Sequence, residues 1–264
     1  MDKLDIILLA GQSNAAGRGM GEVTQPYVPD SRILMMTDNA NPKFQSKDGQ
    51  VYLHLNSPAN NIVSVAEEPP EKKGNFALAF ATRYAQTYLE SDRKILIINA
   101  AVCGTGFARP EWGVGRVLHN RLIGMLEEAL SYNPENRVVA FLWHQGEHDS
   151  FENADWDPEK RYTTHKANLT ATINDIYSRF NLNAVPFIAG GFCDEWYLAN
   201  KEACDAVLKA IRECCAQRGS FVETAGLLSN KQKTGNKDTI HFCKESLHIL
   251  GNKYFDEYAA IRSK

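Results

Sequence analysis

The alternation of short aliphatic segments with longer amphipathic segments limits the folds that are open to this chain. Residues 4–10, 94–101 and 138–143 are apolar runs without regular alternation, which is typical of strands covered on both faces. Segments with helical periodicity separate these runs. Strands that alternate with helices form βαβ units around a parallel sheet. The chain is therefore predicted to be an α/β protein, a three-layer α/β/α sandwich with a mainly parallel sheet.

The predicted sheet has five strands. They are residues 4–10, 94–101, 138–143, 185–191 and 221–224, with 31–36 as an alternative or accessory strand and 51–55 as a short extra one. Helices are predicted over 116–131, 158–180, 198–217 and 245–261. A further helix is predicted to begin directly after Asn75, its capping residue. The stretch 56–74 is predicted to be irregular, with a solvated loop from residue 67 onward. No internal repeat is found, so one domain over residues 1–264 is expected.

The composition argues against several classes of protein. Hydrophobic residues make up 44% of the chain and charged residues 23%, as in a globular enzyme and unlike a disordered chain. The formal net charge of -3 gives no basic surplus, so nucleic acid and membranes are not expected as partners. The apolar stretch after Lys3 is at the lower limit for a secretion signal and contains Asp5. A cytoplasmic location is therefore expected, although a chain trimmed during export would look the same.

Polar clusters follow three of the apolar strands at the points where they end. The clusters are Gly11-Gln12-Ser13-Asn14, Cys103-Gly104-Thr105-Gly106 and Trp143-His144-Gln145-Gly146-Glu147-His148-Asp149. Because ligands bind at the carboxyl ends of parallel strands, we expect these clusters to converge on one rim of the sheet. A fourth cluster, Asp238-Thr239-Ile240-His241-Phe242, precedes the last predicted helix.

Ser13 is a candidate nucleophile. A buried strand that ends in a tight glycine turn can expose a serine hydroxyl, although such a turn is also a common strand terminator. A serine hydroxyl needs a positioned base to react at neutral pH. Asp238 and His241 are three residues apart, so both can lie on one side of a helical turn, with the second imidazole nitrogen left for Ser13. The alternative is a surface aspartate and an unrelated histidine.

Candidate donors for a developing negative charge lie in the second and third clusters. Gly104 and Gly106 allow the main chain to approach a substrate oxygen, and Gln145 offers a side-chain amide. The glycines also fit an ordinary turn between a strand and a helix.

Metal, cysteine and nucleotide chemistry are weaker alternatives. His144, Glu147, His148 and Asp149 are possible metal ligands, but no second His or Cys cluster has a metal-binding spacing, so no metal or other cofactor is expected. The six cysteines contain no CxxC pair and are expected to be free thiols, with Cys103 the candidate if one were catalytic. The glycine-rich segment 17–21 does not match a nucleotide-binding motif.

Taken together, the four clusters resemble the ordered sequence blocks of the SGNH (GDSL-type) hydrolases. More narrowly they resemble the carbohydrate esterase family 6 / sialate O-acetylesterase branch, whose blocks run GQSN, a glycine block, WxQGExD and DxxHF. The resemblance implies a flavodoxin-like fold and removal of O-acetyl groups from sugars without a metal. It implies that Ser13 is the nucleophile, His241 the general base and Asp238 its orienting acid.

The resemblance also implies an oxyanion hole. Its donors would be the backbone N–H groups of Ser13 and Gly104 together with the side chain of Gln145. Adjacent glycines are common in the family's glycine block and are absent here, so a neighbour of Gly104 is an alternative donor. His148 occupies a position where a small residue is common, and its role is open.

Further candidates are predicted to bind the substrate or support the site. They are Gln12, Asn14, Glu147, Arg109 and Trp112. For Glu147 a supporting role is favoured over substrate binding, and for Trp112 a place in the sugar pocket and packing at its rim are both open.

The predicted function is a serine esterase that removes O-acetyl groups from an acetylated carbohydrate, of the acetylxylan or sialate type. One alternative is a broader short-chain esterase or thioesterase of the same fold. Another is a non-catalytic sugar-binding protein, which the presence of a complete Ser, Gly, Gln, Asp and His set disfavours.

Overall fold

Seven strands form the central sheet, in the order β5-β2-β6-β1-β7-β8-β9. Their bounds are β1 (Lys3–Gly11), β2 (Ile33–Asp38), β5 (Asn61–Val65), β6 (Arg93–Asn99), β7 (Arg137–His144), β8 (Phe187–Gly190) and β9 (Gly219–Val222). Adjacent strands are parallel, except that β2 and β5 are antiparallel. A separate hairpin pairs β3 (Lys43–Lys47) with β4 (Gln50–His54). This computed structural model describes residues 2–38, 43–47, 50–54, 61–68, 74–109 and 111–263.

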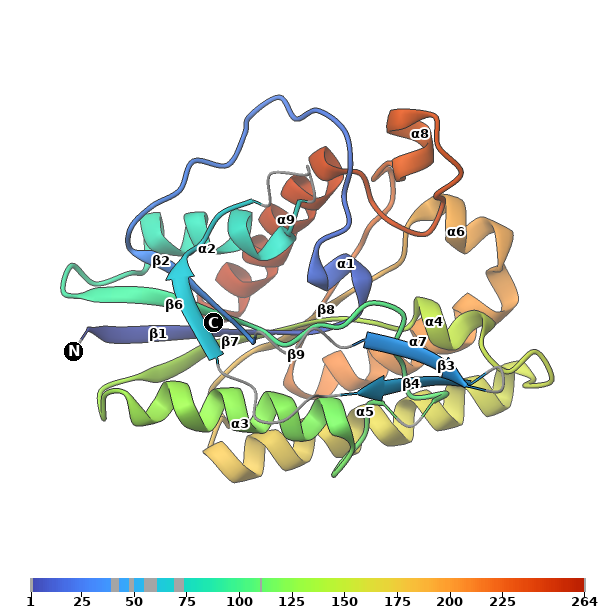
Figure 1. Ribbon diagram of the computed structural model, residues 1–264, viewed down its shortest axis with the longest axis horizontal. Helices are drawn as coiled ribbons and strands as arrows, with labels where there is room; N and C mark the ends of the chain where they lie inside the picture. Colours follow the sequence, from blue (N-terminus) through green and yellow to red (C-terminus); the bar gives the residue numbers. More distant parts are fainter. Residues whose placement is uncertain are drawn as a thin grey trace.

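Helices cover both faces of the sheet (Figure 1). One face packs against α2 (Phe76–Thr87) and α9 (Lys244–Arg262), and the other against α3 (Val117–Ser131), α5 (Pro158–Phe180) and α7 (Lys201–Arg218). The short helices are α1 (Ser13–Ala16), α4 (Glu147–Phe151), α6 (Asp194–Ala199) and α8 (Asn230–Thr234). None of the helices within the described ranges has the length and apolarity needed to cross a bilayer.

The predicted α/β/α sandwich is confirmed, but the predicted number of five strands is wrong. β2 is a full member of the sheet, and β5 lies within the stretch predicted to be irregular. β5 is an edge strand whose residues are half-buried or exposed, so it carries no core-facing pattern in the sequence. The helix predicted over 198–217 is interrupted at Asn200, where α6 ends and α7 begins. Residues 69–73 of the predicted loop lie outside the described residues.

The two ends of β1 have different surroundings. At its amino end the fully buried Asp5 accepts hydrogen bonds from Arg93 Nε, Arg137 Nε and the Tyr84 hydroxyl, each at 2.7 Å. At its carboxyl end, β1 lies between β6 and β7, and Gly11 pairs with His144. The segments that leave these three strands therefore emerge side by side, as the sequence predicts.

Candidate active site

The turn after β1 places Ser13 at the start of α1. The backbone N–H of Gln12 donates to the carbonyl oxygen of His144 at 2.9 Å, which joins the turn to the end of β7. Gly11 has a φ of +130°, and a Cβ atom here would lie 2.1 Å from that carbonyl oxygen. Both the backbone conformation and the approach of β7 therefore require glycine.

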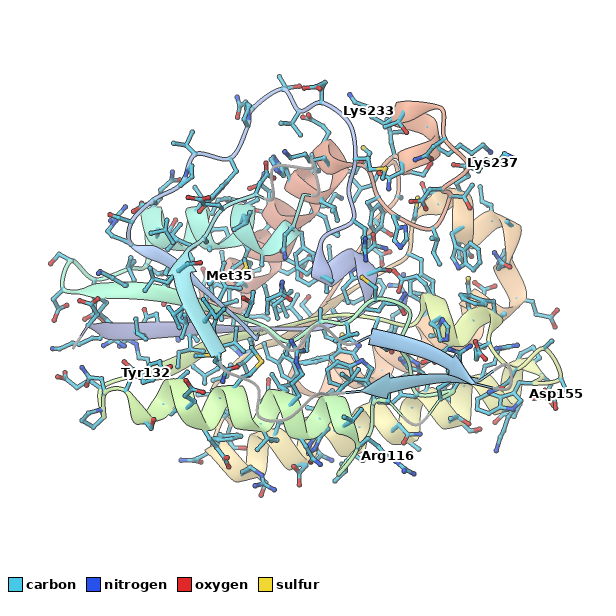
Figure 2. All side chains as sticks on the ribbon, in the orientation of Figure 1. Met35, Arg116, Tyr132, Asp155, Lys233 and Lys237 are labelled. Carbon is cyan, nitrogen blue, oxygen red and sulfur yellow. The ribbon has the colours of Figure 1, made fainter. Side chains whose placement is uncertain are left out.

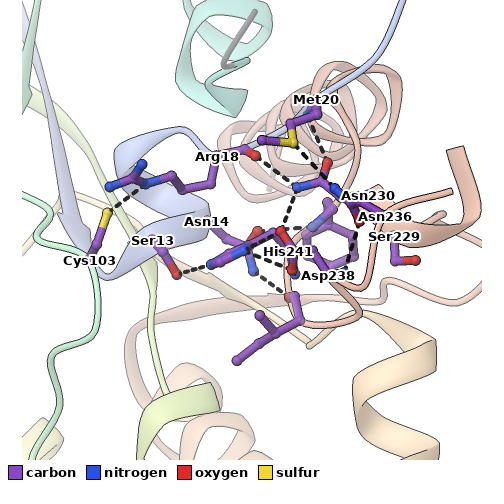
Figure 3. A network of polar contacts seen from close by, with 12 residues as sticks. Ser13, Asn14, Arg18, Met20, Cys103, Ser229, Asn230, Asn236, Asp238 and His241 are labelled. Atoms are coloured by element: carbon purple, nitrogen blue, oxygen red, sulfur yellow. Dashed lines mark hydrogen bonds and ion pairs between the residues drawn. The ribbon is translucent and has the colours of Figure 1, made fainter. Parts of the chain in front are cut away.

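Ser13, His241 and Asp238 form a continuous hydrogen-bonded chain (Figure 3). His241 Nε2 lies 2.8 Å from Ser13 Oγ, and His241 Nδ1 lies 2.8 Å from Asp238 Oδ2. Because a carboxylate only accepts hydrogen bonds, Nδ1 carries the proton and Nε2 is left to accept from the serine hydroxyl. The structure thus brings together three side chains that the sequence places up to 228 positions apart.

Asp238 lies in the loop between α8 and α9, so the predicted helical turn for Asp238 and His241 is wrong. The carboxylate instead closes a local turn, because the backbone N–H of His241 donates to Oδ1 at 3.2 Å. Asn230 Nδ2 donates to Oδ2 at 2.9 Å. Burial raises the pKa of Asp238, but the hydrogen bonds from His241 and Asn230 outweigh it and bring the pKa to about 2. The carboxylate is therefore charged at neutral pH.

A cavity of about 410 Å³ adjoins this chain of hydrogen bonds. Its walls include Ser13, Gly104, Cys103, His148 and His241. Within the described ranges, the backbone N–H groups of Ser13 and Gly104 donate to no acceptor. Both groups are therefore available to bind an oxygen atom of a molecule in the cavity.

Gln145 is fully buried and does not belong to the residues that line this cavity. Its Nε2 lies 3.0 Å from Asp149 Oδ2, 3.3 Å from the Thr105 carbonyl oxygen and 3.4 Å from Gln12 Oε1. Gln12 Oε1 also accepts two backbone N–H groups from the segment 146–148. Gln12 and Gln145 thus join the three rim segments, and a direct contact of Gln145 with an oxyanion stays a prediction.

Asn14 holds the segment that carries His241. Its Oδ1 accepts the backbone N–H of Phe242 at 3.1 Å, and its Nδ2 lies 3.2 Å from the carbonyl oxygen of Ile240. The same Nδ2 donates to Glu147 Oε1 at 2.7 Å. Asn14 and Glu147 are both fully buried, so of their two predicted roles the supporting one fits the structure.

A buried polar chain continues from Glu147 into the core. Burial raises the pKa of Glu147, but His144, whose Nε2 lies 3.4 Å from Oε1, and the Asn14 amide outweigh it and lower the pKa below its ordinary value. His144 Nδ1 lies 3.0 Å from the Tyr254 hydroxyl, which donates to the carbonyl oxygen of Trp143 at 2.8 Å. The ionised carboxylate of Glu147 therefore fixes the orientation of Asn14, whose amide donates to it.

Asp149 fixes the loop that follows β6. Its carboxylate accepts the backbone N–H groups of Phe107 at 3.2 Å and Ala108 at 2.9 Å. His165 Nδ1 lies 2.9 Å from Asp149 Oδ2. Burial raises the pKa of Asp149, but His165 and the backbone donors outweigh it and lower the pKa. Asp149 thus holds the glycine block in place without facing the cavity.

Two residues predicted near the sugar pocket lie outside the cavity wall. Arg109 forms an ion pair with Glu152 at 2.8 Å. Trp112 is 2% exposed, and its Nε1 donates to Thr105 Oγ1 at 3.1 Å, so it supports the glycine block instead of forming a pocket surface. His148 does line the cavity, and burial followed by the charge of Arg109 lowers its pKa. Its imidazole is therefore an uncharged part of the wall at neutral pH.

Each of the four residues considered as metal ligands contacts a different partner outside the set, although His144 Nε2 also lies 3.4 Å from Glu147 Oε1. His144 contacts Tyr254, Glu147 contacts Asn14, His148 contacts Glu152 and Asp149 contacts His165. All six cysteines are free, as predicted, and only Cys103 among them is not fully buried.

Arg18, Met20 and Phe151 also line the cavity, and Asn230 binds the carboxylate of Asp238, although none of these roles was predicted from the sequence. Arg18 lies five residues after Ser13, in a glycine-rich segment considered only as a nucleotide motif. For Asn230 the available signal was a polar residue eight positions before Asp238, which is too common to be informative.

Residues 3–260 match the family described as carbohydrate esterase, sialic acid-specific acetylesterase. The chain belongs to this family. It is therefore a carboxylic ester hydrolase of the carbohydrate acetylesterase class, and the resemblance in the four sequence blocks is confirmed.

Individual relatives agree with the family assignment. The probable carbohydrate esterase At4g34215 of Arabidopsis thaliana is 25% identical over 209 residues, which cover 72% of each chain. The crystal structure of NanS has a TM-score of 0.75 at 19% identity and covers 100% of this chain and 99% of its own. The structure of AT4G34215 from Arabidopsis thaliana has a TM-score of 0.70 at 20% identity, with 98% and 99% covered. The esterase therefore shares its fold with these proteins along essentially the whole chain.

Proposed function

We propose that this esterase removes O-acetyl groups from carbohydrates by a two-step acyl transfer in which Ser13 is the nucleophile. The observation that carries the proposal is the unbroken hydrogen-bonded chain from Ser13 Oγ through His241 to Asp238 at the wall of a cavity. A chain of this kind supplies a nucleophile, a base and the group that orients the base.

In the first step, His241 Nε2 takes the proton of the Ser13 hydroxyl while Ser13 Oγ attacks the acetyl carbonyl carbon. The tetrahedral intermediate then collapses, and the protonated His241 gives its proton to the departing sugar oxygen. In the second step water attacks the acetyl-enzyme by the same route and acetate leaves, with the proton returned to Ser13. The ionised Asp238 stabilises the positive charge that His241 carries in both steps.

The backbone N–H groups of Ser13 and Gly104 would hold the negative oxygen of the intermediate, because both residues line the cavity and neither N–H has an acceptor within the described ranges. Removal of one such donor costs on the order of 10²–10³ in rate. Gln145 would assist by holding the glycine block in register, or by direct donation if its amide turns from Asp149 toward the oxyanion.

The experiment that tests this proposal measures acetate release from p-nitrophenyl acetate by the wild type and by Ser13→Ala. Ser13→Ala should lower kcat by on the order of 10⁴ or more, with the circular dichroism spectrum unchanged. Wild-type hydrolysis at the buffer rate would refute the esterase proposal, and activity retained in Ser13→Ala would refute the assignment of the nucleophile.

The same assay separates an acetylesterase from a broader esterase or thioesterase. We expect kcat/KM to fall steeply for p-nitrophenyl esters longer than propionyl. An equal rate on acetyl and octanoyl esters would favour the broader activity instead.

A further inference from the structure

Phe151 presents an exposed aromatic ring at the wall of the cavity that contains Ser13. It is the last residue of α4, and it is 44% exposed. Among the described residues that line this cavity, Phe151 has the one apolar ring, and the other rings are the imidazoles of His148 and His241. A large apolar side chain that stays open beside a catalytic group is suited to bind a ligand.

The indole of Trp196 on α6 continues this aromatic surface beyond the cavity. The Phe151 ring contacts the rings of both His148 and Trp196, with centroids 4.8 Å and 5.5 Å away and an angle of 79° between the planes in each case. His148 lines the cavity, whereas Trp196 is half-buried and does not. Phe151 therefore lies where the cavity wall passes into the outer surface, and the rings of Phe151 and Trp196 are called the aromatic platform below.

Hydrogen bonds hold the aromatic platform in place. Trp196 Nε1 donates to Ser150 Oγ at 3.2 Å. The buried Arg161 donates through Nη1 to backbone carbonyl oxygens on both sides of Phe151, at 2.6 Å and 2.7 Å. A ligand that packs on these rings therefore meets a surface that is already ordered, which reduces the entropy lost on binding.

The chemistry of the family indicates what covers the aromatic platform. The chain belongs to a family of carbohydrate esterases, so the molecule that enters the cavity is a sugar. A sugar ring has an apolar face of C–H groups, which can pack on the negative face of an aromatic ring. The acetyl group has to reach Ser13 inside the cavity, whereas Phe151 lies at the cavity's edge. The platform is therefore placed to hold the sugar unit next to the acetylated one.

We propose that the aromatic platform of Phe151 and Trp196 binds a second sugar unit, so that the enzyme prefers acetylated units within oligosaccharides to free acetylated monosaccharides. The inference rests on the proposed esterase function and adds the length of the substrate to it. Phe151 supplies the ring on which the second unit packs, and Trp196 supports that ring and extends the surface.

The test compares substrates that differ only in the second unit. Release of acetate is measured for mono-O-acetylated methyl xyloside and the corresponding methyl xylobioside, and for mono-O-acetylated N-acetylneuraminic acid and the corresponding sialyllactose. For at least one pair the wild type should show a kcat/KM about fivefold or more higher for the longer substrate. The difference should lie mainly in KM, because the second unit does not react.

Variants of Phe151 show whether the ring causes this preference. Phe151→Ala should bring the ratio of longer to shorter substrate close to one, and Phe151→Trp, which keeps an aromatic ring, should retain the preference. The matched control is Tyr132→Ala, which removes a half-buried aromatic ring directly after α3 and should keep the wild-type ratio. Figure 2 shows Tyr132 at the opposite end of the molecule from Asp155, which follows α4.

A wild type without preference for the longer substrate in either pair overturns the proposal. So does a Phe151→Ala enzyme that loses activity equally on both members of a pair, since that result assigns the ring to the acetylated unit or to the shape of the cavity. Neither result resembles failure of the esterase proposal itself, in which the wild type would not hydrolyse p-nitrophenyl acetate.

Discussion

At the scale of single residues, Asp238 orients His241 and, as a charged carboxylate, also stabilises the fold. The substitution Asp238→Asn tests both roles. In Asp238→Asn the amide can donate to His241, which favours the imidazole tautomer that cannot accept the Ser13 proton. We expect kcat on p-nitrophenyl acetate to fall by on the order of 10³–10⁴. A loss below about tenfold would contradict the orienting role of Asp238.

The same variant tests the pKa of Asp238. A folded-state pKa of about 2, below the ordinary value of 3.8, gives stability that is present above pH 4 and lost as the pH falls toward 2. Since the side chain is one quarter exposed, this contribution is at most about 2 kcal/mol. Urea unfolding should therefore show Asp238→Asn less stable than the wild type at pH 6, with a smaller difference at pH 2.

Asn14 gives a second prediction for a single residue. Asn14→Ala removes the hydrogen bonds on both sides of His241 and leaves Glu147 without its amide donor. We expect the free energy of unfolding to fall by about 1–3 kcal/mol and kcat to fall by about tenfold or more.

The control for Asn14 is Asn136→Ala at the amino end of β1. Asn136 is also buried and also bonds backbone groups on two sides, those of Leu4 and Ala129, both at 2.8 Å. This variant should lose similar stability while kcat stays within about twofold. Equal kcat values in the two variants would mean that Asn14 stabilises the fold without positioning His241.

The contact between Ser13, His241 and Asp238 could be predicted because each residue lies in a short motif whose place in the fold is readable. The Asn14–Glu147 bond could be located only loosely, because its partners are 133 residues apart and no spacing in the sequence shows that they meet. For Trp112 the sequence leaves two positions open, a place in the sugar pocket and packing at its rim. Its position near the glycine block is apparent from the sequence, but whether an indole faces a cavity or the core depends on packing from other elements.

At the scale of elements, the loop after β6 depends on a carboxyl group that resists ionisation. Glu111 is 5% exposed, and its Oε2 accepts the backbone N–H of Gly106 at 3.3 Å. Burial raises the pKa of Glu111 to about 7, since Gly106 and the charge of Arg109 offset only part of the cost. The protonated carboxyl is therefore the form that the fold prefers.

This raised pKa predicts how stability depends on pH. Below about pH 4.5 the carboxyl is neutral in the folded and unfolded chains, so folding carries no ionisation cost. As the pH rises toward 7, the unfolded chain ionises first and stability falls by about 3 kcal/mol. Glu111→Gln keeps an acceptor for Gly106, so its unfolding free energy should lack this fall. Parallel curves for the two proteins between pH 4.5 and 8 would contradict the prediction.

The predictability of each element follows from its burial. Most residues of β1 and β6 and the carboxyl half of β7 are buried, and these strands appear in the sequence as apolar runs without regular alternation. β5 has Ile62 50% exposed and Val63 38% exposed, so it could not be told from a loop by its pattern. The short helices α1 and α4 were missed because their residues serve the site instead of forming an apolar stripe.

At the scale of the whole molecule, the polar clusters of the candidate active site and a buried charge network lie at opposite ends of the strands. The four polar clusters meet at the carboxyl ends, and the Asp5 network joins β1, β6 and β7 at the amino ends. In the sequence, Asp5 stands out as a charge within an apolar run. Its partners Arg93 and Arg137 could not be predicted, because they come from strands far along the chain.

This separation makes a prediction for Asp5→Asn. The substitution leaves Arg93, which is 5% exposed, as a buried cation without a counter-charge, and such a loss costs about 3–5 kcal/mol. Arg137→Met removes a cation that is 48% exposed from the same carboxylate, and it should cost about 1 kcal/mol or less. In thermal unfolding, Asp5→Asn should lower Tm by about 10 °C and Arg137→Met by a few degrees at most.

Both variants should keep wild-type kcat on p-nitrophenyl acetate below their unfolding temperatures, because β1 transmits no displacement to Gly11 while it stays paired with β6 and β7. A tenfold fall of kcat in folded Asp5→Asn would show instead that the two ends of the sheet are coupled.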